Sequence, residues 1–321
     1  MVSKKWLLSF MVLTIIPIVI VFSINYIVDP YGDNETVITK EFKPVLNERS
    51  KKYDYIFYKQ NYKKYNCMIL GSSRVMKITP QDNEQTKECY NFGIHIGNIA
   101  ERLFLIKEWL KYSKLEKVYI GIDFYNFHKN KRVLFVSHST FKNDTSGNYL
   151  SISALKLSIK SIINKLKNKP QTFFKNSGEI CYFNKDLLIK SGKYDESNDT
   201  LNRSSNSFIY DSFIKDRFEI EDKVFDILKE IKQICKQNNI KIYTFITPMY
   251  ETMILDIEKN KSLNNDFNLI RKKLKKIFPD IKDFSKSSLE NKTRNNFYDA
   301  VHYRQSYAKK IINKLHKNSK N

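Results

Sequence analysis

The chain has 321 residues, of which 41% are hydrophobic, so it is long enough to bury the core of one large domain or two small ones. Lys and Arg number 56 against 34 Asp and Glu, and the resulting formal charge of +22 favours an anionic partner such as a lipid headgroup layer or a phosphate-rich polymer. No zinc-finger spacing, aromatic RNA-binding stretch or Gly-Lys-Ser phosphate loop is present, so we expect no nucleic-acid partner. Because Lys, Asn and Ile are abundant everywhere in the chain, a compositional bias explains the charge excess equally well.

An uncharged apolar stretch fills residues 6–28. About 20 apolar residues suffice to cross a bilayer as a helix. Lys4 and Lys5 precede the stretch and acidic residues follow it, which predicts a single-pass anchor in the cytoplasmic membrane with the amino terminus inside and the rest extracytoplasmic. A cleaved signal peptide would have a shorter apolar region and an Ala-x-Ala-like site. Residues 1–5 are then a cytoplasmic tail and residues 29–52 a juxtamembrane linker.

Beyond the anchor, short apolar runs alternate with amphipathic helices. The runs predict buried strands at 66–70, 89–92, 118–124, 240–246 and, more weakly, 280–284. Apolar residues spaced three or four apart predict helices at 99–110, 224–235 and 308–315. This alternation predicts an α/β domain with a mainly parallel five-stranded sheet covered on both faces by helices, formed by residues 53–126 and 214–317.

One long stretch, residues 127–213, interrupts this alternation. It is rich in Asn, Ser and Lys, has an amphipathic helix at 152–166 and contains no convincing strand, so we expect a mostly helical or irregular insertion after the third strand. Insertions at the carboxyl ends of strands often form lids and binding surfaces, although a partly disordered filler has the same composition. Residues 318–321 are expected to be a tail.

The four cysteines are Cys67, Cys89, Cys181 and Cys235. They form no Cys-x-x-Cys pair and have no histidine cluster beside them, so we expect no metal site. Export would permit disulfides, and Cys67 and Cys89 lie on neighbouring predicted strands, but one sequence does not give the connectivity. The expectation is therefore four buried thiols.

The first predicted strand stops abruptly at Gly71, and Ser72, Ser73 and Arg74 follow it. Ligands of an open α/β sheet bind beyond the carboxyl ends of its strands, which is where these residues are expected. A glycine there allows a sharp turn, and a following serine can present its hydroxyl. An ordinary turn explains the same residues, since a nucleophilic serine also needs a base and a group that holds the base.

Of the five histidines, His302 stands in the most informative position. It follows Asp299 by three residues, after the fifth predicted strand and just before the last amphipathic helix. The two side chains are therefore expected in one loop at the carboxyl edge of the sheet, with the carboxylate orienting the imidazole. An Asp three residues before a His also arises by chance, so the position carries more weight than the spacing.

These motifs together resemble a known family. Gly-x-Ser after the first strand and Asp-x-x-His before the last helix resemble the SGNH (GDSL-like) hydrolase superfamily. The stretches VDPYG, YNFGIHIGN and IGIDFYNF look like its membrane-anchored branch, which includes the D-alanyl-lipoteichoic acid biosynthesis protein of the dlt system and the alginate O-acetylation proteins. The resemblance covers about residues 60–125 and 240–315. It implies a flavodoxin-like three-layer sandwich with Ser73 as nucleophile, His302 as general base and Asp299 as its orienting group.

The resemblance also implies three oxyanion donors: the serine N–H, a glycine N–H in the second block and an asparagine side chain in the third. Gly97 is the best match for the glycine, with Gly93 as the alternative. The third block lacks its asparagine and offers Asp123, a carboxylate that opposes an oxyanion unless it is protonated or turned away; losing one donor costs about 100- to 1,000-fold in rate. Asn98 or Asn126 is a candidate substitute.

Arg74, next to the candidate nucleophile, is expected either to stabilise an anionic group or to lie solvated on the surface.

The resemblance implies acyl transfer through a serine ester, with water or a polymer hydroxyl as acceptor and with no metal or organic cofactor. The implied partners are an anionic cell-surface polymer, such as a polysaccharide or teichoic acid, and a membrane-bound O-acyltransferase that supplies the acyl group. The alternative is a catalytically inactive, membrane-tethered module that binds an anionic envelope polymer and partner proteins through its Lys-rich faces.

Overall fold

The computed structural model describes residues 4–32, 38–131, 136–141, 149–191 and 206–317. The chain divides into two compact units, each described here by itself. The first unit comprises Met1–Asn47, Lys142–Phe174 and Ile180–Tyr194. The second comprises Glu48–Phe141, Lys175–Glu179 and Asp195–Asn321. The predicted insertion thus contributes residues to both units.

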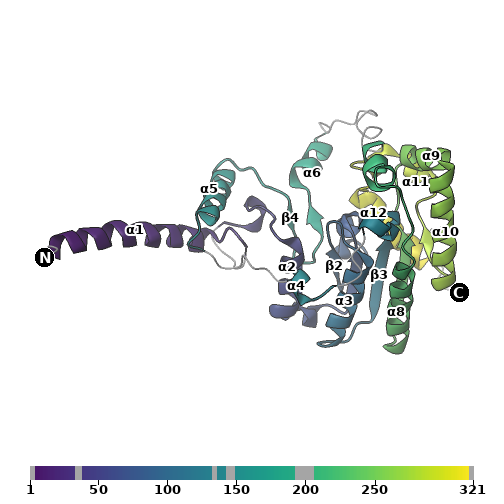
Figure 1. Ribbon diagram of the computed structural model, residues 1–321, viewed down its shortest axis with the longest axis horizontal. Helices are drawn as coiled ribbons and strands as arrows, with labels where there is room; N and C mark the ends of the chain where they lie inside the picture. Colours follow the sequence, from purple (N-terminus) through teal and green to yellow (C-terminus); the bar gives the residue numbers. More distant parts are fainter. Residues whose placement is uncertain (1–3, 33–37, 132–135, 142–148, 192–205, 318–321) are drawn as a thin grey trace. The chain divides into compact units, whose positions relative to one another are not determined.

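The second unit is built on a five-stranded sheet in the order β2-β1-β3-β6-β7. Figure 1 labels two of its strands, β2 and β3. Its strands are β1 (Cys67–Gly71), β2 (Cys89–Gly93), β3 (Lys117–Ile122), β6 (Lys241–Ile246) and β7 (Lys282–Asp283). Every neighbouring pair in this sheet is parallel. The predicted α/β fold with a mainly parallel sheet is confirmed.

Helices cover both faces of this sheet. They are α2 (Glu48–Tyr53), α3 (Ile99–Leu110), α4 (His138–Phe141), α8 (Lys223–Gln237), α9 (Glu251–Lys259), α10 (Lys261–Ile277), α11 (Leu289–Lys292) and α12 (Gln305–His316). Alternate residues of β1 point to opposite faces: Met68 and Leu70 join one apolar core with α3, α8 and α10, while Ile69 joins a second core with α12. Two cores on one sheet give the three layers of the predicted sandwich.

Three expectations from the sequence need correction in detail. The third strand ends at Ile122 rather than at residue 124, because Phe124 begins a short 3-10 helix, η6 (Phe124–Phe127). The fifth strand is only Lys282–Asp283. The insertion, expected to lack strands, contains an antiparallel pair, β4 (Phe173–Phe174) and β5 (Ile180–Cys181).

A disulfide joins Cys67 to Cys89, which are register partners at the amino ends of β1 and β2. The expectation of four thiols is therefore wrong for this pair. In-register parallel neighbours bring the two Cα atoms to 4.2 Å, a contact that the sequence suggests only once the strand order is known. Cys181 and Cys235 are not disulfide-bonded, and Cys235 is buried.

The first unit contains the apolar helix α1 (Lys4–Val28), together with α5 (Ile152–Leu166), α6 (Phe183–Lys190) and the pair β4–β5. By length and composition α1 is able to cross a membrane, and none of its most apolar window is buried against the protein. It is followed by Pro30, which cannot continue a helix.

The disulfide is expected to contribute to the stability of the second unit. A cross-link over a separation of 22 residues stabilises by about 3 kcal/mol through the entropy of the unfolded chain. Cys67→Ser with Cys89→Ser should lower the free energy of unfolding by about that amount in urea denaturation. The control is Cys181→Ser, which replaces a half-buried cysteine that takes no part in a disulfide and should change little. Equal effects of the two changes would contradict this role.

Candidate active site

The site begins where β1 ends. At Gly71 the chain turns into a short 3-10 helix, η4 (Ser73–Lys77), which folds back against the strand. A Cβ atom on residue 71 would lie 2.6 Å from Cγ1 of Val75, so glycine permits this close approach. Ser72 caps η4, its Oγ accepting the N–H two residues further on at 3.2 Å. Ser73 is therefore the first residue of the helix and stands, half-buried, at the carboxyl edge of the sheet.

The second part of the site is the loop that precedes α12. An antiparallel bridge between Phe297 and Tyr303 closes this loop, and the Tyr298 N–H donates to the carbonyl of His302 at 2.8 Å. A third bond, from the Tyr250 N–H to the carbonyl of Ala300 at 2.8 Å, ties the loop to the segment after β6. These backbone bonds fix the loop at the same edge of the sheet as η4.

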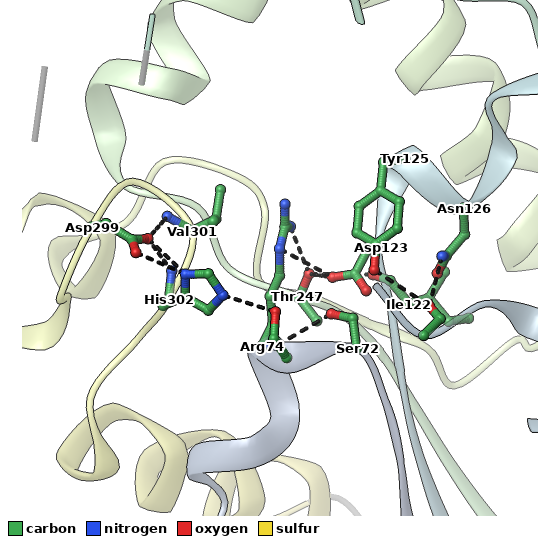
Figure 2. A network of polar contacts seen from close by, with 12 residues as sticks. Ser72, Arg74, Ile122, Asp123, Tyr125, Asn126, Thr247, Asp299, Val301 and His302 are labelled. Atoms are coloured by element: carbon green, nitrogen blue, oxygen red, sulfur yellow. Dashed lines mark hydrogen bonds and ion pairs between the residues drawn. The ribbon is translucent and has the colours of Figure 1, made fainter. Parts of the chain in front are cut away.

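Three side chains from these two segments form a continuous hydrogen-bonded relay. Ser73 Oγ lies 2.8 Å from Nε2 of His302. Nδ1 of His302 lies 2.8 Å from Oδ2 and 3.0 Å from Oδ1 of Asp299 (Figure 2). The imidazole is thus held on one side by a carboxylate and faces a hydroxyl on the other, an arrangement that allows it to accept the hydroxyl proton. The structure brings together the three residues predicted for catalysis.

Asp299 stays charged over a wide pH range. Burial alone would raise its pKa, but the hydrogen bond and the charge of His302, with the N–H groups of Val301 and His302 at 3.0 and 2.8 Å, lower the pKa from 3.8 to about 2. The carboxylate is therefore charged, and able to hold the imidazole, at pH values well below neutral.

Asp123 belongs to a buried ion cluster and is paired with two arginines. Oδ1 accepts a hydrogen bond from the hydroxyl of Thr247 at 2.5 Å and lies 3.3 Å from Nε of Arg74 (Figure 2). Oδ2 lies 3.7 Å from Nη2 of Arg102. All three charged side chains are buried. Two guanidinium groups thus offset the negative charge of Asp123, for which the sequence analysis identified no partner.

Arg74 is buried, so the alternative of a solvated surface residue is wrong. Its Nη1 donates to the hydroxyl of Thr247 at 3.1 Å, and its guanidinium lies 5.2 Å from the ring centroid of Phe208 and 5.8 Å from that of Tyr125. Arg74 therefore pairs with Asp123 and holds the turn next to Ser73 against its buried neighbours.

The two candidate glycine donors already have acceptors. The N–H of Gly97 donates to the carbonyl of Ile94, and the N–H of Gly93 donates to Oδ1 of Asn91, each at 2.8 Å. A Cβ on residue 97 would lie 2.8 Å from the carbonyl oxygen of Gly71, so the missing side chain lets this loop pack on the end of β1. Gly97 thus supports the turn that presents the serine.

The two candidate asparagines are also engaged. Oδ1 of Asn98 caps α3 by accepting the N–H of Glu101 at 2.9 Å. Asn126 donates from Nδ2 to the carbonyl of Gly97 at 3.1 Å and accepts at Oδ1 from Nη2 of Arg102 at 2.9 Å. By contrast, the N–H of Ser73 has no acceptor among the residues that the structure describes.

The sequence missed Arg102 and Thr247 as parts of this site. Thr247 follows the fourth strand directly, so its place at the carboxyl edge was a usable signal. Arg102 lies inside α3, where an arginine normally faces solvent, and nothing in the sequence marked it as buried. Within the described ranges, no group of His, Cys, Asp and Glu side chains is arranged to hold a metal ion.

Comparisons with known proteins add little to this geometry. No family model and no curated protein matches the chain. A similar solved structure is that of a Streptococcus pneumoniae chain provisionally described as a platelet activating factor, with 11% sequence identity and a TM-score of 0.40 over 84% of this chain and 92% of that one. A structural similarity this weak carries no argument about function.

Asp299→Asn is expected to destabilise the fold in a pH-dependent way. Because the folded-state pKa is below the ordinary value, the charged carboxylate contributes stability above about pH 4 and loses it as the pH falls towards 2. The variant should unfold with about 1–2 kcal/mol less free energy at pH 7, and this difference should shrink between pH 4 and 2 in chemical denaturation. The exposed Asp280→Asn is the control, and a pH-independent difference for Asp299→Asn would contradict the relay.

Asp123→Asn tests whether the fold depends on the buried charge of Asp123. The change leaves two buried guanidinium groups without their counter-charge, which should cost about 3–5 kcal/mol in free energy of unfolding. Asp226→Asn makes the same change in an exposed ion pair with Lys229 and should cost less than about 1 kcal/mol. Urea denaturation of both variants gives the comparison. A small effect at residue 123 would show that its charge is not needed by the fold.

Proposed function

We propose that this chain is a membrane-anchored, serine-dependent acyl-transfer enzyme, an O-acyltransferase or esterase of the SGNH type, that acts outside the cytoplasmic membrane on a cell-surface polysaccharide or a teichoic-acid-like polymer. The observation that carries the proposal is the unbroken relay from the Ser73 hydroxyl through His302 to Asp299. The motifs that resemble the SGNH superfamily supply the same three residues independently of these distances.

The relay suits a two-step acyl transfer. Ser73 Oγ attacks the ester carbonyl while Nε2 of His302 takes the hydroxyl proton, and Asp299 stabilises the imidazolium that forms. The imidazolium then returns the proton to the leaving alcohol, which gives a serine ester. An acceptor hydroxyl or water, deprotonated by the same nitrogen, attacks this ester and releases Ser73 with its proton restored. The N–H of Ser73 is the donor that we assign to the developing oxyanion.

Three features support the proposed location and substrate class. The apolar helix α1 is long enough to anchor the chain in a bilayer. The Cys67–Cys89 disulfide suits an oxidising compartment outside the cytoplasm. The formal charge of +22 favours a negatively charged polymer as the acceptor. A membrane-bound O-acyltransferase as the source of the acyl group follows from the resemblance alone.

A second candidate function is an inactive module that binds an envelope polymer. The bonds of Gly93 and Gly97 favour it, because neither N–H is free to act as a second oxyanion donor in the structure. The relay favours the enzyme, since a binding module has no need for a carboxylate-oriented imidazole against a serine hydroxyl. We therefore place the enzyme first.

A fluorophosphonate probe distinguishes the two functions. The full-length protein in detergent should be labelled, and Ser73→Ala should abolish labelling and lower ester turnover by at least about 10⁴-fold. Ser72→Ala is the matched control, because its hydroxyl caps η4 and does not face the imidazole; this variant should keep its labelling. The absence of labelling in the unaltered protein would favour the binding module.

The same Ser73→Ala change tests the polymer in cells. If the proposal holds, mass analysis of the envelope glycan should show loss of an acyl substituent in the variant but not in Ser72→Ala. An unchanged glycan, with labelling intact in the purified protein, would leave the acyl-transfer chemistry standing and contradict the proposed acceptor.

A further inference from the structure

Helix α5 leaves four large apolar side chains exposed and buries small residues instead, which is unusual for a helix of a soluble domain. Its buried face is made of small residues, Ala154, Ser158 and Ser161. Its exposed apolar residues are Ile152, Ile159, Ile163 and Leu166. An amphipathic helix normally packs its large apolar residues inward, since that removes most apolar surface from water. In α5 the apolar stripe is left uncovered within the described unit.

Specific polar contacts fix this orientation. Ser158 Oγ donates to Oδ1 of Asn25 at 2.8 Å, and Nδ2 of Asn25 donates to the carbonyl of Tyr149 at 2.6 Å. Asn25 is fully buried at the carboxyl end of α1, so α5 lies beside the end of the apolar helix (Figure 1). Further along, Nδ2 of Asn164 donates to the carbonyl of Phe42 at 3.2 Å. Small residues allow this close packing of one helix on another.

The apolar stripe of α5 is narrow and bordered by cations. At 100° per residue, six of its seven large apolar side chains fall within an arc of about 100°, and only the half-buried Leu157 lies outside it. Lys156 and Lys160 lie beyond one border of this arc, and both are exposed. Lysines in such positions extend their stems along apolar surface while the amines reach water or anionic headgroups.

The position of α5 beside the apolar helix α1 indicates a membrane as the partner of its exposed stripe. The neighbouring helix α1 exposes apolar residues along its length, from Trp6 to Ile27, which is the surface of a membrane span. The bond between Ser158 of α5 and Asn25 of α1 places α5 against the carboxyl-terminal end of this apolar helix. We propose that α5 is an interfacial membrane helix that buries this face at the boundary between headgroups and acyl chains, with its lysines against anionic headgroups. The inference rests on the proposed anchoring by α1.

Tryptophan fluorescence in vesicles tests the orientation of α5. The full-length chain, with Trp6→Phe to remove the signal from the span, is reconstituted in vesicles of phosphatidylcholine and phosphatidylglycerol, with or without brominated acyl chains. The signal of the buried Trp109, measured in the Trp6→Phe protein without a further probe, is subtracted from each variant. A probe introduced by Ile159→Trp lies in the apolar stripe, and Ser153→Trp is the matched control on the exposed polar side of the same helix. Brominated lipid should quench the first probe by about half and leave the second nearly unchanged.

A second probe and a separate assay keep the outcomes distinct. Ile163→Trp should behave like Ile159→Trp, because both lie in the stripe. Flotation of the protein with vesicles reports its attachment to the membrane as a whole, so protein that does not float would overturn the anchoring. Protein that floats, but whose stripe probes are quenched no more than Ser153→Trp, would overturn the interfacial helix and leave the anchoring intact. Shielding of the stripe probes by another protein in native membranes, without lipid quenching, would also overturn it.

Discussion

The hydrogen bond between Ser73 Oγ and Nε2 of His302 is the interaction on which the proposed chemistry depends. It joins residues 229 positions apart, one just after the interior strand β1 and the other just before α12. A serine hydroxyl is a weak nucleophile at neutral pH unless a base lies within hydrogen-bond reach. The sheet provides that reach, because parallel strands bring their carboxyl ends, and the loops that follow them, to one edge. The disulfide lies at the opposite edge, where it ties β1 to β2 without touching the site.

The buried cluster of Arg74, Asp123 and Arg102 resolves the difficulty posed by a carboxylate where the resembled family has an asparagine. The carboxylate of Asp123 is buried, and its negative charge is offset by two guanidinium groups and the Thr247 hydroxyl. The cluster has one more positive than negative charge and begins at the residue after the candidate nucleophile. In a dry environment such an excess favours negative charge nearby, so the cluster is compatible with an oxyanion on the Ser73 side.

Much of the fold was predictable because buried parallel strands are short apolar runs that stop at turn residues, as β1 does at Gly71. The relay was predictable because Ser73 follows such a stop, and because Asp299 and His302 stand together just before the last amphipathic helix. The pairing of Asp123 with Arg102 was not, because it depends on the packing of α3 against the strand ends. For α5 the periodicity gave the helix, but only the bonds of Asn25 show which face is buried. The β4–β5 pair was missed because strands of two residues leave no pattern.

A crystal structure of the full-length chain after reaction with a fluorophosphonate tests the central claim most directly. The account predicts phosphorus bonded to Oγ of Ser73, a phosphoryl oxygen that accepts the N–H of Ser73, and an imidazole of His302 still held by Asp299 within hydrogen-bond distance of the adduct. Phosphorus on a different residue, or a His302 ring directed away from Ser73 with its carboxylate bond broken, would contradict it.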